Sequence, residues 1–94
     1  MFIAECLRAE AGAVLRIAER LNEREGTHWR NALNCLANCE GHIVVGGMGK
    51  SGLIGLKISA TFSSLGQPSH FVHPSEAIHG DLGRIRRGDF ALLL

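Results

Sequence analysis

The most chemically distinctive stretch of the sequence is Gly46-Gly47-Met48-Gly49-Lys50-Ser51-Gly52, in which a lysine stands among four glycines and a serine. Glycine lets the backbone come close to a ligand, and the free N–H groups of a helix start attract anions. The Lys50 ammonium adds a positive charge. This loop therefore predicts a binding site for a phosphate group, although an ordinary exposed lysine remains the alternative interpretation of Lys50.

A second segment with chemical potential is His79-Gly80-Asp81. A histidine exchanges protons near neutral pH, so His79 is a candidate acid or base. A lysine ammonium on a rigid loop stabilises a developing oxyanion or assists opening of a sugar ring. The alternative interpretation of His79 is a loop histidine with a structural hydrogen bond.

Two nucleotide-binding motifs fit the glycine loop incompletely. A Walker A loop ending in Gly49-Lys50-Ser51 needs a glycine where the chain has Val44. Gly47, Gly49 and Gly52 satisfy the dinucleotide pattern, but the next strand, within residues 67–72, carries no acidic residue to bind a ribose. A small phosphorylated ligand is therefore favoured over a nucleotide.

The elements that position these residues alternate between strand and helix. Their predicted order is two amphipathic helices over residues 2–21 and 27–40, a strand over 43–45, a helix over 53–65, a strand over 69–73, a helical turn from Pro74, a loop over 77–83, a turn over 84–89 and a buried strand over 90–94. Such alternation predicts an α/β fold with a parallel sheet. Ligands bind at the carboxyl ends of parallel strands, where both segments would emerge.

The composition excludes several classes of protein. The chain has ten basic and nine acidic residues, so its charge favours neither nucleic acid nor an anionic membrane. No apolar run reaches the length of a membrane span and no signal peptide opens the chain, so we expect a cytoplasmic protein. Cys6, Cys35 and Cys39 are expected to be buried free thiols, and no histidine spacing supports a metal site.

The glycine–lysine loop is followed by Gly55 and Lys57, by Phe71-Val72-His73-Pro74, and by Glu76-Ala77 and His79-Gly80-Asp81-Leu82-Gly83. Together these motifs resemble the sugar isomerase (SIS) domain of the arabinose 5-phosphate isomerases. The resemblance implies a doubly wound, flavodoxin-like three-layer fold, with residues 1–40 as an N-terminal helical segment and 41–94 as the first part of the SIS domain.

The same resemblance implies an activity. Members interconvert D-arabinose 5-phosphate and D-ribulose 5-phosphate for lipopolysaccharide octulosonate synthesis, use no cofactor and form homo-oligomers. The catalytic residues would be Lys50 and His79, and substrate would be bound by Gly47, Gly49, Lys50, Ser51, His79 and Gly80. A glutamate, a second histidine and a serine-rich loop would follow Leu94, so half a site is expected here. The competing hypotheses are a non-catalytic phosphosugar-binding SIS module and an inactive fragment.

Overall fold

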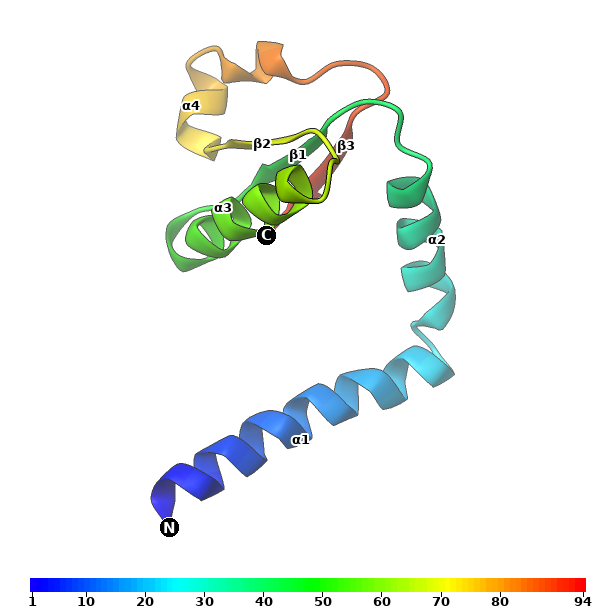
Figure 1. Cartoon of the computed structure of the whole chain (residues 1–94), viewed down its shortest axis with the longest axis vertical. Coiled ribbons are helices and arrows are strands. Elements are labelled where there is room, and N and C mark those ends of the chain that lie inside the picture. Colours follow the sequence, from blue (N-terminus) through cyan, green and yellow to red (C-terminus); the bar gives the residue numbers. More distant parts are fainter. The chain divides into compact units, whose positions relative to one another are not determined.

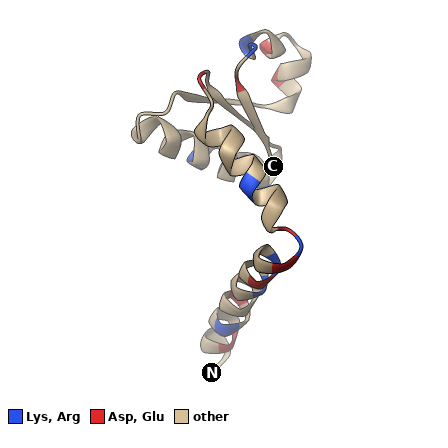
Figure 2. Cartoon of the chain, turned by 90° about the vertical axis from the view of Figure 1, so that its right-hand side faces the viewer, with Lys and Arg blue, Asp and Glu red and all other residues tan.

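The computed structural model describes all 94 residues, which form two compact units, Met1–Asn34 and Cys35–Leu94 (Figure 1). The first unit is helical. Helix α1 spans Phe2–Glu23, and α2 begins at Gly26 and ends at Ala37. Figure 2 shows that charged residues are spread along α1 and the turn after it.

The turn between the two helices is closed by Glu25. Its carboxylate accepts two hydrogen bonds from the Arg20 guanidinium, at 2.6 and 3.1 Å. Its carbonyl accepts the backbone N–H of Trp29 at 3.1 Å. The predicted cap at Thr27 is therefore wrong, because α2 already starts one residue before it and Glu25 supplies the first carbonyl.

The second unit is built on a parallel sheet with strand order β2-β1-β3. The strands are β1, Ile43–Gly46; β2, Ser69–Val72; and β3, Phe90–Leu93. The predicted α/β class is confirmed. Every residue of the central strand β1 is buried, whereas β3 alternates between half-buried and exposed residues. The prediction of a fully buried third strand is wrong because β3 lies at the edge of the sheet.

Helix α3, Gly49–Ser64, packs closely on one face of this sheet. A Cβ atom added to Gly55 would lie 3.0 Å from the Phe71 ring and 3.1 Å from Val45. The buried Ser59 hydroxyl shares a 2.8 Å hydrogen bond with Ser69, which fixes the helix against β2. The helix begins four residues earlier than the predicted start at residue 53.

Two short helices follow β2, namely α4, Pro74–Ile78, and the 3₁₀ helix η1, Asp81–Arg84. The prolyl start of α4 was predicted, and His73 caps it by accepting the Ser75 N–H on Nδ1 at 3.0 Å. The predicted loop over 77–83 is only partly correct, because its two ends are helical.

The cysteines also differ from expectation. Cys6 and Cys35 are exposed and Cys39 is half-buried, so the prediction of three buried thiols is wrong. None of the helices combines the length and the apolar character that crossing a membrane requires.

Candidate functional site

The two segments singled out from the sequence leave the sheet at the same edge. Gly46, the last residue of β1, lies opposite Val72, the last residue of β2. The glycine loop therefore starts beside the segment that leads through α4 to His79 (Figure 1). Because both strands are parallel, this is the carboxyl edge, where ligands of α/β sheets bind.

The glycine loop turns tightly into α3. A Cβ atom added to Gly52 would lie 2.8 Å from the Gly47 carbonyl oxygen, and one added to Gly47 would lie 3.1 Å from the Gly52 nitrogen. A side chain on either residue would push the loop away from the first helical turn. Glycine at both positions thus lets β1 run into α3 with only two residues between them.

Three residues of the predicted site form the first turn of α3. They are Gly49, with a left-handed φ of 58°, and the exposed Lys50 and Ser51. The first N–H of this helix to find a backbone acceptor belongs to Gly52, which donates to the Met48 carbonyl at 3.2 Å. No side chain caps the helix start. The three preceding N–H groups and the Lys50 ammonium therefore form an electropositive surface suited to an anion.

His79 and Gly80 lie at the junction of α4 and η1. The exposed His79 ends α4 by donating its N–H to the Glu76 carbonyl at 3.1 Å. Gly80 has a φ of 122°, which L-residues rarely adopt, and this conformation reverses the chain into η1. The turn leaves the His79 imidazole exposed at its tip.

The structure thus places all six predicted site residues on the two segments at the carboxyl edge. Gly47 contacts the first turn of α3 directly. Lys50 and His79 come from different segments, and their side chains make no hydrogen bond or ion pair. This arrangement places an uncapped helix start and an ammonium on one segment and an exposed imidazole on the other. No three His, Cys, Asp or Glu side chains are grouped so that they could hold a metal ion.

Sequence analysis did not identify a group of residues at β2 that consists of Arg84, His70 and His42. Arg84 begins the turn predicted over residues 84–89, and its guanidinium donates to the Phe71 carbonyl at 3.3 Å. The adjacent His70 ring makes an edge-to-face contact with His42, with ring centroids 5.6 Å apart. Burial, then the charge of Arg84, lowers the pKa of His70 below its ordinary 6.5. The clue in the sequence was an arginine directly after the polar loop.

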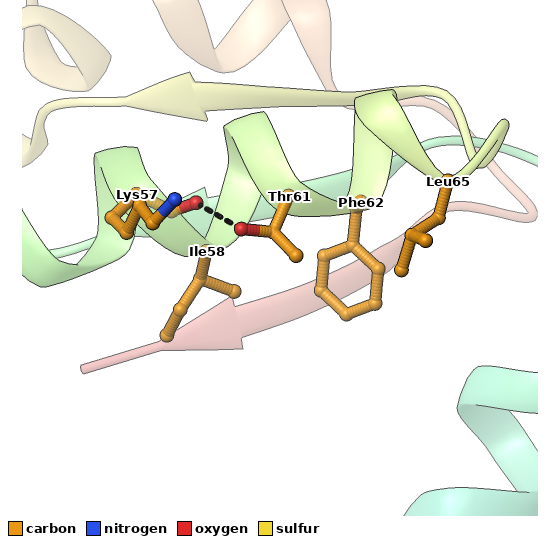
Figure 3. Close-up of a pocket in the computed structure, with 5 residues that line it drawn as sticks. All are labelled: Lys57, Ile58, Thr61, Phe62 and Leu65. Carbon is orange, nitrogen blue, oxygen red and sulfur yellow. Dashed lines mark hydrogen bonds between the residues drawn. The ribbon is translucent and has the colours of Figure 1, made fainter.

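A shallow hollow of about 170 Å³ on α3 is unrelated to the predicted chemistry (Figure 3). It is lined by Lys57, Ile58, Thr61, Phe62 and Leu65. The Thr61 hydroxyl is occupied by a 3.0 Å hydrogen bond to the Lys57 carbonyl. Four of these residues lie in the second half of α3 and Leu65 directly follows it, whereas the glycine loop includes the first turn of the helix.

The family model of the SIS domain matches residues 36–94. The chain belongs to the SIS domain family. The match includes the glycine loop, α3, β2 and the turn at His79 and Gly80 between α4 and η1, hereafter the His79 turn. Every predicted site residue therefore lies within the SIS domain.

Several curated relatives of this SIS domain are arabinose 5-phosphate isomerases. GutQ of Escherichia coli K12 is 52% identical over 80 residues, which make up 85% of this chain and 25% of that protein. A probable arabinose 5-phosphate isomerase of Haemophilus influenzae is 44% identical over 90 residues, or 96% of this chain and 26% of that protein. The chain thus spans about a quarter of the length of these relatives.

Solved structures show the same SIS fold. The E. coli CFT073 protein c3406, in complex with arabinose 5-phosphate, superimposes with a TM-score of 0.72 and 36% identity, over 97% of this chain and 48% of that one. A putative phosphosugar isomerase involved in capsule formation from Bacteroides fragilis gives a TM-score of 0.62 and 32% identity, over 94% and 48%. The fold of this SIS domain is therefore shared with a protein solved in complex with arabinose 5-phosphate and with a protein described as a putative phosphosugar isomerase.

Proposed function

We propose that this SIS domain belongs to an aldose-ketose isomerase that interconverts D-arabinose 5-phosphate and D-ribulose 5-phosphate. The observation that carries the proposal is the electropositive first turn of α3, with Lys50, at the same sheet edge as the His79 turn. The names of the curated relatives and the arabinose 5-phosphate bound to the c3406 protein support this choice of sugar.

The first part of the proposal is the recognition of the anionic substrate. Gly47 and Gly49 bring the backbone close to the sugar phosphate, while Lys50 and Ser51 contribute an ammonium and a hydroxyl group. Gly80 holds the other side of the site open because it carries no side chain. Charge and hydrogen bonding then orient the reacting end of the sugar relative to His79.

The second part is proton transfer. In the open-chain aldose, a base removes the proton from C2, and the electron pair forms an enediolate with the C1 carbonyl. Return of a proton to C1 and reformation of the carbonyl at C2 give the ketose. His79 exchanges the proton, and the Lys50 ammonium stabilises the oxyanion or assists ring opening. The reaction conserves electrons and needs no redox cofactor.

The proposed isomerase activity also implies a metabolic role, a cellular location and a set of partners. An isomerase that makes arabinose 5-phosphate supplies octulosonate synthesis for lipopolysaccharide, which places the protein in the cytoplasm. The partner is the phosphosugar, and the subunits assemble into a homo-oligomer. The chain itself contributes the helical segment of residues 1–40 and the first part of the SIS domain, residues 41–94.

Titration of the chain with D-arabinose 5-phosphate, followed by backbone amide NMR, tests the site. We expect the amides of Gly49, Lys50 and Ser51 to shift most. Lys50→Ala should weaken binding by roughly ten-fold or more, because a hydrogen bond to a charged group is worth about 1.5–3 kcal/mol. Lys57→Ala, on the same helix but away from the loop, is the matched control and should bind as the parent does.

Turnover is measured separately, as formation of D-ribulose 5-phosphate, in a chain extended beyond Leu94 to include the expected glutamate, second histidine and serine-rich loop. His79→Asn should abolish turnover while preserving binding, whereas His28→Asn, on α2, should change neither. Binding without turnover in this extended chain would favour the non-catalytic phosphosugar-binding module. Absence of any shift at the first turn of α3 would overturn the proposed site.

A further inference from the structure

One side-chain hydrogen bond connects the His79 turn to the sheet. Arg84, the last residue of η1, donates from its guanidinium to the carbonyl of Phe71 in β2 at 3.3 Å. The same nitrogen lies 3.5 Å from the Asp81 carboxylate at the start of η1. Because β2 is an edge strand, one row of its backbone groups has no partner strand. Arg84 supplies a donor to that edge.

The segment between Pro74 and Arg84 has no other hydrogen bond to a strand. Its remaining hydrogen bonds are local, such as His79 N–H to the Glu76 carbonyl at 3.1 Å and Gly83 N–H to the Gly80 carbonyl at 3.0 Å. Two very short helices and a glycine with positive φ give this segment little rigidity of its own. The position of His79 relative to the sheet therefore depends strongly on Arg84.

His70 lies next to this connection, one residue before the carbonyl that Arg84 binds. Its Nε2 atom is shielded from solvent and has no hydrogen-bond partner. The charged or titratable groups facing it are Arg84 from η1, His42 before β1 and Asp89 before β3. Two of the three repel a positive charge, and only Asp89 attracts one.

We propose that Arg84 is a positioning residue for His79, and that its bond to β2 persists only while the neighbouring His70 is uncharged. The proposal rests on the proposed function in that His79 is the proton-exchanging group. A protonated His70 would place a second positive charge beside the guanidinium and weaken its hold on the Phe71 carbonyl. The His79 turn then loosens.

The direction of the pH dependence follows from His70. Burial and the charge of Arg84 lower the pKa of this histidine, so the folded turn disfavours its protonation. The turn is therefore ordered at neutral and higher pH. It loses order as the pH falls below 6.5 and through the lowered pKa of His70.

The test is the NMR order parameter of the His79 and Gly80 backbone amides in the full 94-residue chain. At pH 7.5 we expect rigid values near 0.85 in the parent and values below about 0.6 in Arg84→Met. Arg84→Lys, which keeps a positively charged donor group on a flexible side chain, should recover part of the order. Arg86→Met is the matched control and should retain the parent values, because the hydrogen bonds of Arg86 use only its backbone: its N–H donates to the Asp89 carboxylate and its carbonyl accepts the Asp89 N–H.

The pH profile separates positioning from a general structural role. The parent should lose order at His79 as the pH falls below 6.5, and His70→Phe, which keeps a ring beside His42, should not. If Arg84→Met leaves His79 as ordered as in the parent, or if His70→Phe retains the pH dependence, the proposal is overturned.

Turnover in the same variants bears on the proposed function independently. If the parent isomerises arabinose 5-phosphate, Arg84→Met should lower kcat by about ten-fold with KM within about two-fold, because His79 is misplaced while the α3 phosphate surface is intact. A ten-fold loss of kcat/KM that came only from a higher KM would contradict a positioning role for Arg84. Because half of the site is expected to follow Leu94, these rates are measured in the extended chain. If that chain shows no turnover, the isomerase proposal fails, while the order parameters still decide the role of Arg84.

Discussion

Asp89 connects two segments at the amino end of the sheet, opposite the carboxyl end that carries the candidate site. Its Oδ1 accepts the His42 N–H at 2.9 Å, and its Oδ2 accepts the Arg86 N–H at 2.8 Å. The side chain is only 4% exposed. A Cβ atom added to Gly41 would lie 2.5 Å from Oδ1, so the carboxylate fits closely against the chain entering β1. One carboxylate thus joins the approaches to β1 and β3.

These bonds predict an acid-sensitive fold. The Arg86 N–H, and then the His42 N–H, hold the pKa of Asp89 below its ordinary 3.8. The stabilisation is therefore present above about pH 4 and is lost as the pH falls through the lowered pKa. The expected result is a urea midpoint, followed by circular dichroism, that drops in this acid range.

The Asp89→Asn variant should be less stable at pH 7, because an amide cannot accept both N–H groups. It should also lose the acid dependence below pH 4 that Asp89 provides. Glu40→Gln, an exposed carboxylate nearby, is the control and should behave as the parent. Equal acid sensitivity in the parent and Asp89→Asn would contradict this assignment.

Among the elements, α3 links the sheet most directly to the candidate site. Its first turn presents Lys50 and Ser51, while Gly52 and Gly55 let it approach the loop and the sheet. The helix therefore places its uncapped N–H groups only two residues after the central strand. The close packing of the helix explains why glycines occupy these two positions, where a helix would otherwise favour alanine.

Opposite effects are expected when alanine replaces glycine in α3 and in α1. Gly52→Ala should destabilise the second unit by about 1–3 kcal/mol, because the new methyl group would lie 2.8 Å from the Gly47 carbonyl oxygen. Gly12→Ala meets only the flexible end of Arg16 at 3.4 Å and should favour α1 by about 0.5–1 kcal/mol.

Urea unfolding measured by NMR, with separate signals for the two units, would report both changes. A neutral or stabilising Gly52→Ala would show that the loop adapts to a side chain. The close approach would then not be required for the turn from β1 into α3.

At the scale of the second unit, the two faces of the sheet are covered unequally. Helix α3 packs on one face. The other face forms an apolar groove of about 410 Å³ beneath α4 and η1, in which Leu93 is 77% exposed. Its lining residues are Val44, Gly46, Val72, Pro74, Ala77, Ile78, Leu82, Ile85, Ala91 and Leu93.

The groove predicts binding of an apolar fluorescent dye such as anilinonaphthalene sulfonate to the folded chain. Leu93→Lys should lower the dye fluorescence while changing stability by no more than about 0.5 kcal/mol, since the replaced side chain is already exposed. Leu15→Lys, on the exposed surface of α1, is the control. Unchanged fluorescence in Leu93→Lys would locate the dye elsewhere.

Local features of the sequence were sufficient to predict much of this SIS domain. The β-branched run before four glycines indicated β1 and the loop, Pro74 indicated the start of α4, and alternation of strand and helix indicated a parallel sheet. These features act over a few neighbouring residues, so they can be read along the chain. The placement of Lys50 and His79 on segments of one sheet edge followed from that order.

Other features were decided only by tertiary structure. The strand order leaves β3 at an edge, which exposes Leu93 although its sequence is uniformly apolar. Arg84 finds its acceptor, Phe71, thirteen residues away. Both depend on which segments become neighbours in space, because an apolar strand or an arginine is compatible with several surroundings. Local sequence therefore determined the elements and the candidate residues, and packing determined which residues are exposed and which hold the His79 turn to the sheet.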